Sequence, residues 1–220
     1  MNPLSAFAEF FQGGGPFMYV ILAVGVLCLA LIAERFWVIS MAARVNAGKF
    51  GDDIMRCLKN NDPARAVELA RQVPGPVAGV ALGILTRQSN DEEKLQNAAD
   101  AEATIELPPL SRRLPFLGML ANSATLLGLL GTIFGLTTAF SAVGAADPSQ
   151  RSAFLAAGIS QALNTTAFGL IVAVPTMLAH GFLVAKLDSV VEQVDQISVR
   201  MIKALSRRRP APTAGQKKAA

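Results

Sequence analysis

The sequence predicts an all-α integral membrane protein with three transmembrane helices and long cytoplasmic extensions. Hydrophobic residues make up 52% of the 220 residues and charged residues only 16%, and the mean hydropathy is +0.41, a composition typical of membrane proteins. Three stretches of 24, 33 and 34 residues contain no Asp, Glu, Lys or Arg, namely 10–33, 114–146 and 152–185. Because a helix needs about 20 apolar residues to cross the hydrocarbon, each stretch can hold one span.

The composition also excludes several classes of protein. Cys28 lies in the first span, Cys57 follows it, and no CxxC is present, so we expect neither a disulfide scaffold nor a metal site, and no cofactor. Residues 1–16 carry no Lys or Arg and no small-residue cleavage site follows the apolar run, so the first span is expected to stay in the mature protein. The basic residues lie beside the spans with few aromatic residues among them, which favours anionic lipids over nucleic acid as their partner.

The distribution of basic residues predicts the topology. Ten of the 20 Lys and Arg lie in residues 41–113 and eight in 186–220, whereas the loop after the second span has only Arg151. The positive-inside rule then places the N-terminus outside and the C-terminus in the cytoplasm of a multi-pass membrane protein. In order, the predicted segments are an outer amphipathic helix (1–15), the first transmembrane helix (16–40), a cytoplasmic helical region (41–113), the second transmembrane helix (114–146), an outer loop (147–152), the third transmembrane helix with its cytoplasmic extension (153–206) and a disordered basic tail (207–220).

The N-terminal segment has the spacing of a short amphipathic helix. Leu4, Phe7, Ala8 and Phe11 recur at i, i+3, i+4 and i+7, which predicts a helix lying on the outer membrane surface. Three glycines and a proline at 13–16 should end it before the first span. The alternative is a frayed terminus with scattered phenylalanines.

The cytoplasmic region should contain short helices. Asp62 followed by Pro63 is typical of an N-cap with proline at the first helical position, and this helix should end at the Pro-Gly-Pro of 74–76. A second helix is expected from about Asp91, with Pro108-Pro109 interrupting it before the next span. We expect this region to pack against the extended membrane helices or against neighbouring copies, and not to form an independent core.

Beyond the third span, apolar residues recur at spacings of 4, 3, 4, 3 and 4. They are Leu183, Leu187, Val190, Val194, Ile197 and Met201. This heptad stripe predicts that the helix continues out of the membrane. Self-association through the stripe is favoured, and packing against the same chain's cytoplasmic helices is the alternative. The tail from Arg207 should be attracted to anionic lipids.

Polar side chains within the spans indicate which helix faces meet protein or water, because they are costly in hydrocarbon. In the second span Asn122, Thr125 and Thr132 follow spacings of 3 and 7 and share one stripe, near glycines that let neighbouring backbones approach. The third span has five polar residues within seven positions. They are Ser160, Gln161, Asn164, Thr165 and Thr166.

Such oxygens can line a water-filled path or bind a cation, but threonines also form hydrogen bonds between helices, worth about 0.6 to 2 kcal/mol each. For one threonine the second role is favoured, whereas for this cluster we favour a polar pathway. Thr, Asn and Gln do not titrate near neutral pH, and the three charge-free stretches contain no carboxylate. Ion relay would therefore need a partner that supplies one.

The sequence leaves two alternative functions. An intramembrane serine hydrolase would need His180, the only histidine, but Ser160 lies 20 residues away, about 30 Å along one helix. Ser123 lacks a GxSxG elbow, so His180 is expected to be a satisfied residue near the cytoplasmic interface and the protein not an enzyme. No GxxxxGK[ST] loop supports nucleotide-driven pumping. The second alternative is a passive channel or scaffold oligomer without gradient coupling.

Two strings resemble one known family. The string at 114–136, LPFLGMLANSATLLGLLGTIFGL, is followed at 158–175 by GISQALNTTAFGLIVAVP. Together they resemble the MotA/TolQ/ExbB proton-channel family over about residues 108–185. The chain length, three spans and N-out topology are similar to the ExbB/TolQ branch more than to the four-span MotA branch.

This resemblance implies a multi-pass protein of the bacterial inner membrane, with its N-terminus in the periplasm and its C-terminus in the cytoplasm. It also implies a homopentamer whose second and third spans line a pore around two copies of a single-span partner of the ExbD, TolR or MotB kind. Ion flow past the partner's aspartate would drive rotation and convert the gradient into work, for outer-membrane energised transport, envelope integrity or gliding motility. Thr132 and Thr166 match the family's pore threonines. The predicted ion pathway consists of Thr132, Thr166, Thr165, Gln161, Asn164 and Thr125.

The chain departs from the family at one position. Ser160-Gln161-Ala162 stands where ExbB and TolQ members have Ala-Glu-Ala, and glutamine cannot release a proton. The pair Thr165-Thr166 resembles sodium-driven members, and a hard cation prefers several oxygen ligands. Protons remain the favoured ion, with sodium as the alternative.

Overall fold

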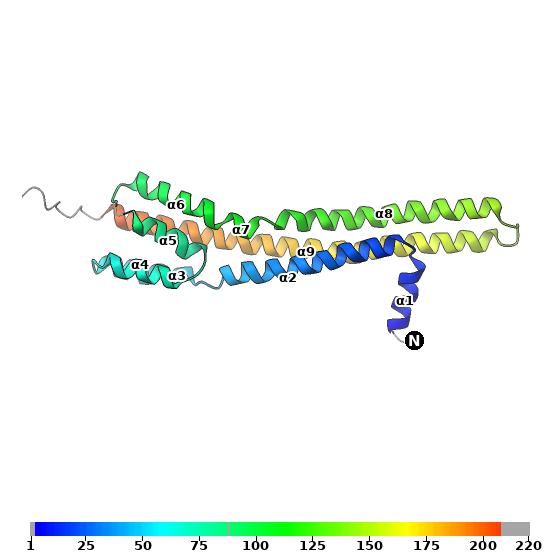
Figure 1. Ribbon diagram of the computed structural model, residues 1–220, viewed down its shortest axis with the longest axis horizontal. Helices are drawn as coiled ribbons and strands as arrows, with labels where there is room; N and C mark the ends of the chain where they lie inside the picture. The colour runs from blue at the N-terminus through cyan, green and yellow to red at the C-terminus, as the bar shows by residue number, and fades with distance from the viewer. Residues whose placement is uncertain (1–2, 88, 208–220) are drawn as a thin grey trace, which may run out of the picture. The chain divides into compact units, whose positions relative to one another are not determined.

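In the computed structural model, residues 3–87 and 89–207 are described, with side chains from residue 7 onward, and these residues form helices without any strand (Figure 1). The all-helical prediction is therefore confirmed for the described part. The predicted disordered tail lies outside it, apart from Arg207. The helices are α1 (Pro3–Gly13), α2 (Phe17–Ala42), α3 (Ala47–Lys59), α4 (Pro63–Gln72), α5 (Pro76–Thr86), α6 (Glu92–Glu106), α7 (Pro108–Ser111), α8 (Leu114–Ala145) and α9 (Arg151–Ser206).

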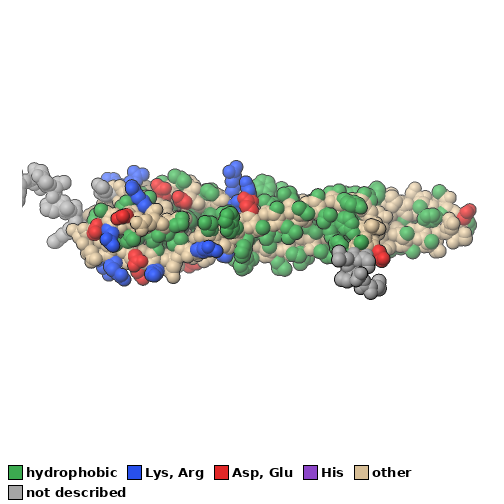
Figure 2. Space-filling view, turned by 60° about the horizontal axis from the view of Figure 1, so that its bottom comes forward, with side chains coloured by type: hydrophobic (Ala, Val, Ile, Leu, Met, Phe, Trp, Pro, Cys, Tyr) green, Lys and Arg blue, Asp and Glu red, His purple; other side chains and the backbone are tan. Residues whose placement is uncertain are grey.

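Three helical stretches of the described chain, which contain α2, α8 and α9, are long and apolar enough to cross a membrane. This confirms the three predicted spans. Large apolar side chains lie exposed along all three, such as Leu29 at 69%, Leu126 at 64% and Leu178 at 71%, and Figure 2 shows how densely hydrophobic side chains cover this part of the surface. Such surfaces need lipid or other protein around them.

The chain divides into two compact units. The membrane unit comprises 1–35 and 113–182, and the polar unit comprises 36–112 and 183–220. The membrane unit contains α1, most of α2, α8 and the first half of α9. The polar unit contains α3 to α7 with the end of α9.

Small residues form the contact between α8 and α9 in the membrane unit. The α8 residues on this face are buried, and beyond its first turn they are Leu117, Ala121, Ala124, Gly128, Gly131, Gly135 and Ala139. A Cβ added at Gly169 would lie 2.8 Å from the Ala124 carbonyl oxygen and 3.0 Å from the Gly128 Cα. The two backbones therefore touch, as in small-residue contacts of other membrane helices.

The predicted N-terminal helix is present as α1, so the frayed-terminus alternative is wrong for residues 3–13. Its aromatic side chains pack inward against α9: the Phe10 and Phe11 ring centroids lie 6.4 and 5.6 Å from that of Phe168. Met18 and Ile21 of α2 complete this small core with Phe168. The predicted position of α1 on the outer membrane surface stays a prediction.

The predicted caps in the polar unit are confirmed. The Asp62 side chain accepts a hydrogen bond from the backbone N–H of Arg65 at 3.0 Å, with proline at the start of α4. The Asp91 side chain caps α6 by accepting from the Glu93 N–H at 3.2 Å. The interruption at Pro108-Pro109 also occurs, since α6 ends at Glu106 and the short α7 begins at Pro108.

Two helices that were not predicted from the sequence, α3 and α5, supply much of the core of the polar unit. Phe50, Ile54 and Leu58 share one buried face of α3. Most of α5 is buried, Val80 and Ile84 completely.

The heptad stripe of α9 is buried within its own chain. Its residues from Leu183 to Met201 are at most 8% exposed, and Val194, Ile197 and Met201 belong to the same core as Ile54 of α3. The favoured interpretation of the stripe as a self-association seam is therefore wrong, and the intrachain alternative holds. The reason is that α3 to α6 are too short to bury their apolar faces without the long α9 beside them. The expectation that this region packs against an extended membrane helix is confirmed.

The contact between α8 and α9 predicts opposite effects for two glycines of α9. Gly169→Ala should destabilise the protein by about 1 to 3 kcal/mol, because the new methyl group meets backbone that cannot move aside. The matched change Gly181→Ala should be neutral or slightly stabilising, because no atom lies within 4 Å of the added Cβ and alanine favours helix. Thermal unfolding in detergent measures both, and equal melting temperatures would contradict the contact.

Candidate functional site

The polar stripe of α8 lies on the surface of the membrane unit. Asn122 and Thr125 are exposed and Thr132 is half-buried. Each threonine hydroxyl donates to a carbonyl of its own helix, Thr125 to Ala121 at 3.3 Å and Thr132 to Leu129 at 2.5 Å. A hydroxyl has one proton but two lone pairs, so these oxygens can still accept from water or bind a cation.

Thr165 is completely buried in α9. Its hydroxyl lies 2.7 Å from the Gly14 carbonyl oxygen and 2.8 Å from that of Gln161. The first contact joins residues 151 positions apart in the sequence. Thr165 of α9 therefore anchors the segment that connects α1 to α2.

Gln161 and Asn164 face the same connection. A Cβ added at Gly15 would lie 2.3 Å from Nε2 of Gln161, and one at Gly13 would lie 3.2 Å from Nδ2 of Asn164. Gly15 also has a φ of +73°, a conformation that glycine adopts without strain. The glycine run, expected only to break a helix, thus forms the closely packed partner of the polar cluster.

Thr166 occupies a different contact. Its hydroxyl donates to the Gly128 carbonyl of α8 at 3.1 Å. Thr132 lies one turn along α8 from Gly128, so the two threonines predicted to line the pore belong to the same stretch of the α8–α9 contact.

The six predicted pathway residues therefore form two groups. Gln161, Asn164 and Thr165 contact the α1–α2 connection, and we call them the turn-binding group. The other three, Thr125, Thr132 and Thr166, lie at the α8–α9 contact or on the α8 surface beside it, and we call them the threonine group. In the threonine group, Thr125 is exposed and Thr132 and Thr166 are half-buried, so this group combines polar oxygens with a surface open to a further helix.

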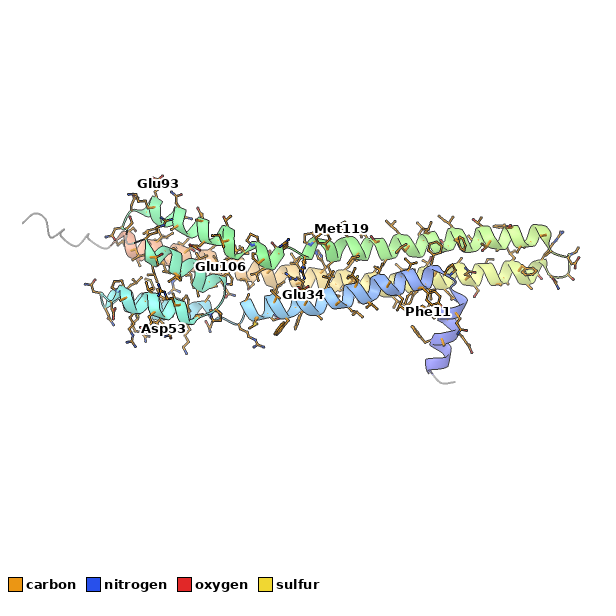
Figure 3. The ribbon with its side chains drawn as sticks, in the orientation of Figure 1. Phe11, Glu34, Asp53, Glu93, Glu106 and Met119 are labelled. Atoms are coloured by element: carbon orange, nitrogen blue, oxygen red, sulfur yellow. The ribbon has the colours of Figure 1, made fainter. Side chains whose placement is uncertain are left out.

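The acidic residue that ends the first charge-free stretch is held by two arginines. Glu34 accepts a hydrogen bond from Nη2 of Arg35 at 2.9 Å and another from Nη1 of Arg113 (Figure 3). Arg35 is only 6% exposed. Charge-assisted pairs of this kind are strong, so we assign Glu34 a structural role in joining the ends of two helices. Nowhere in the described chain do three His, Cys, Asp or Glu side chains form a group that could hold a metal.

The geometry does not support a serine hydrolase. Ser160 and His180 lie on the single helix α9, 20 residues apart, which keeps them about 30 Å from each other. The Ser123 hydroxyl donates to the Met119 carbonyl at 2.8 Å. The His180 ring lies beside Gly118, 3.8 Å from the position of an added Cβ.

Comparison with known proteins agrees with these features. Residues 70–196 match the family model described as the MotA/TolQ/ExbB proton channel family, a range that includes both groups of site residues. The chain is 30% identical over 170 residues to a putative biopolymer transport protein, ExbB-like 3, of Synechocystis sp., covering 76% of this chain and 80% of the relative.

Two further relatives have ExbB and TolQ names. A putative biopolymer transport protein ExbB homolog of Methanothermobacter thermautotrophicus is 25% identical over 198 residues, which cover 90% of this chain and 70% of the relative. The Tol-Pal system protein TolQ of Haemophilus influenzae is 34% identical over 85 residues, 39% of this chain and 37% of the relative. The family contains channels that energise transport and is not an enzyme class. Since its model matches more than half of the chain and the relatives carry ExbB and TolQ names, this multi-pass membrane protein belongs to the MotA/TolQ/ExbB proton-channel family, in its ExbB/TolQ-like branch.

Proposed function

We propose that this protein is the ion-channel subunit of an inner-membrane motor. Five copies form a ring with a periplasmic N-terminus and a cytoplasmic C-terminus, and the ring surrounds two copies of a single-span partner of the ExbD, TolR or MotB kind. The motor converts an ion gradient into mechanical work. The observation that carries the proposal is the threonine group. Thr166 donates to the Gly128 carbonyl of α8, Thr132 lies one turn from Gly128 on the same helix, and the charge-free stretches that contain them have no carboxylate.

The exposed polar side chains of α8 support a lined pore. Asn122 and Thr125 would be costly against lipid, yet they are exposed in the isolated chain. They are satisfied if this side of α8 faces water or another helix. A ring with α8 toward its centre places the stripe in the pore while the apolar sides of α2 and α9 meet lipid and neighbouring copies.

A partner carboxylate completes the ion path. Hydroxyl and amide groups do not exchange protons near neutral pH, and Glu34 is paired with two arginines. An acidic residue on a helix inside the ring would supply the missing proton carrier. The partner's outer domain would then decide which process is driven: outer-membrane energised transport, envelope integrity or gliding motility. Anionic lipids are the proposed partners of the basic residues beside the spans.

The energy of ion flow is sufficient for such a motor. A monovalent cation crossing about 100 mV releases roughly 2.3 kcal/mol, so a few ions per cycle match the cost of rearranging a packed helix contact. The proposed ion is the proton. Sodium is less favoured because the Thr165 hydroxyl, which would bind it, is buried against the Gly14 carbonyl.

A passive channel or scaffold oligomer is the second candidate function. One observation favours it: the hydroxyls of Thr165 and Thr166 both donate to backbone carbonyls of another helix or turn, as threonines that only join helices do.

The subunit count and companion distinguish the two candidates. Native mass spectrometry of the protein extracted from its own membranes in mild detergent should show five copies with two of a single-span protein that has an aspartate within its span. A bare oligomer in several detergents, with no gradient-dependent activity, would favour the scaffold.

Ion flux should depend on the threonine group. Thr132→Val should lower gradient-driven flux through the reconstituted complex about tenfold or more, because a hydrogen bond to a charged species is worth about 1.5 to 3 kcal/mol. Thr137→Val is the matched control, since Thr137 is an exposed threonine of the same helix with the same kind of bond, to Ile133 at 2.8 Å. Equal flux in both variants would remove Thr132 from the pathway.

Substitutions at Thr165 test whether the transported ion is the proton or sodium. Thr165→Ala should lower thermal stability by about 1 to 3 kcal/mol, because the buried Gly14 carbonyl loses its donor, and flux should be insensitive to sodium before and after the change. Thr165→Ser keeps the hydroxyl and should retain most of the stability. Sodium-dependent flux in the unaltered protein that Thr165→Ala abolishes would identify a sodium site and overturn the proton assignment.

A further inference from the structure

The polar unit has a groove whose charged side chains are all basic. The groove has a volume of about 520 Å³ and lies between α3 and the end of α9. Four cationic residues line it, with apolar side chains between them: Lys59, Arg200, Lys203 and Arg207, beside Met55 and Leu58. No carboxylate is among the lining residues, and we call this surface the basic groove.

Most of this charge is not neutralised within the chain. Arg200 pairs with Asp52, Nη2 to Oδ1 at 2.6 Å. Lys59, Lys203 and Arg207 are exposed and form no ion pair with other residues that the structure describes. Exposed like charges held together in a groove favour an acidic occupant.

The same unit has a complementary surface on α6 and on another side of α9. A second groove, of about 500 Å³, is lined by Asp100 of α6 together with Leu187 and Val191 of α9. Asp188 and Asp195 lie beside these two α9 residues, and Glu93 lies seven positions before Asp100, on the same side of α6. We call these four acidic residues the acidic face. Each is exposed, and in the described chain none of them is part of an ion pair.

The acidic face and the basic groove lie on different sides of the polar unit. Around α9, Asp188 and Asp195 fall on one flank of the exposed side and Arg200 and Arg207 on the other, by the 100° step of the helix. One copy therefore cannot bring the two surfaces together.

We propose that neighbouring copies join head to tail through these surfaces, the basic groove of one copy receiving the acidic face of the next. The inference rests on the proposed ring and adds the contact that closes it outside the membrane. Two different patches on different sides of one unit form a heterologous interface, which generates a closed ring when the rotation closes. Opposite charges across it fix the register and exclude contacts between like faces.

A second copy is a better occupant than a small anion. Met55 and Leu58 form an apolar part of the groove, which a protein surface covers and a hydrated anion does not. The chain itself supplies the acidic face in the same unit, with a similar number of unpaired charges.

Charge reversal tests the proposal on the full-length protein in mild detergent. Lys59→Glu/Lys203→Glu should raise the concentration for half-dissociation about tenfold or more, because like charges across an interface repel. Glu93→Lys/Asp195→Lys should do the same. The chain that combines all four changes should recover part of the assembly, since the reversed residues again meet opposite charges across the interface. Lys49→Glu/Arg87→Glu is the control for the first double variant, with the same change in net charge at exposed residues outside both surfaces.

Mass photometry measures the assembly, and circular dichroism checks that each variant keeps its helix content. Two outcomes would overturn the interface while leaving the proposed ring intact. One is unchanged oligomers in both double variants, and the other is a loss of assembly that the variant with all four substitutions does not reverse. An unaltered protein that is monomeric throughout would instead overturn both. A shift to lower assembly at high salt in the unaltered protein supports the interface, because salt screens exposed charges.

Discussion

The close contact between α8 and α9 is the constraint on which the membrane unit depends. In hydrocarbon, helices gain little from apolar burial against each other, so backbone approach and satisfied hydrogen bonds hold them together. Gly128 and Gly169 permit that approach, and the Thr166 hydroxyl bonds the Gly128 carbonyl at the same level. The residues of the proposed pathway are therefore also residues of the packing. Any rearrangement during ion flow must keep this contact or exchange it for an equivalent one.

Spans, caps and helix breaks were predictable from the sequence because each depends on local residues. Each charge-free stretch is long enough to hold one transmembrane helix. Asp62 and Asp91 cap helices by accepting from backbone N–H groups two or three residues away. The threonine stripe on α8 was also predictable from helical spacing. Each of these features lies within a few turns of the chain.

The rest depends on contacts between distant residues. The heptad stripe of α9 has the same spacing whether it packs on a second copy or on α3 and α5, and only the fold brings Ile54 beside Val194. Likewise, no spacing rule links Gly14 to Thr165 across 151 positions. For this reason the polar cluster of α9 was predicted as one pathway, whereas the structure divides it between the turn and the contact with α8.

The place of Gln161 at the α1–α2 connection explains why this residue is a glutamine. The Gln161 side chain packs on the left-handed turn at Gly15, where its Nε2 leaves no room for a Cβ. An amide both donates and accepts hydrogen bonds without charge, whereas a carboxylate in the same place only accepts and would have to be desolvated beside the turn. Glutamine therefore suits a residue that holds α1 and α2 against α9. In the proposed motor, the proton-carrying role then belongs to the partner, and Thr132 and Thr166 are the proposed groups of this chain that work with it.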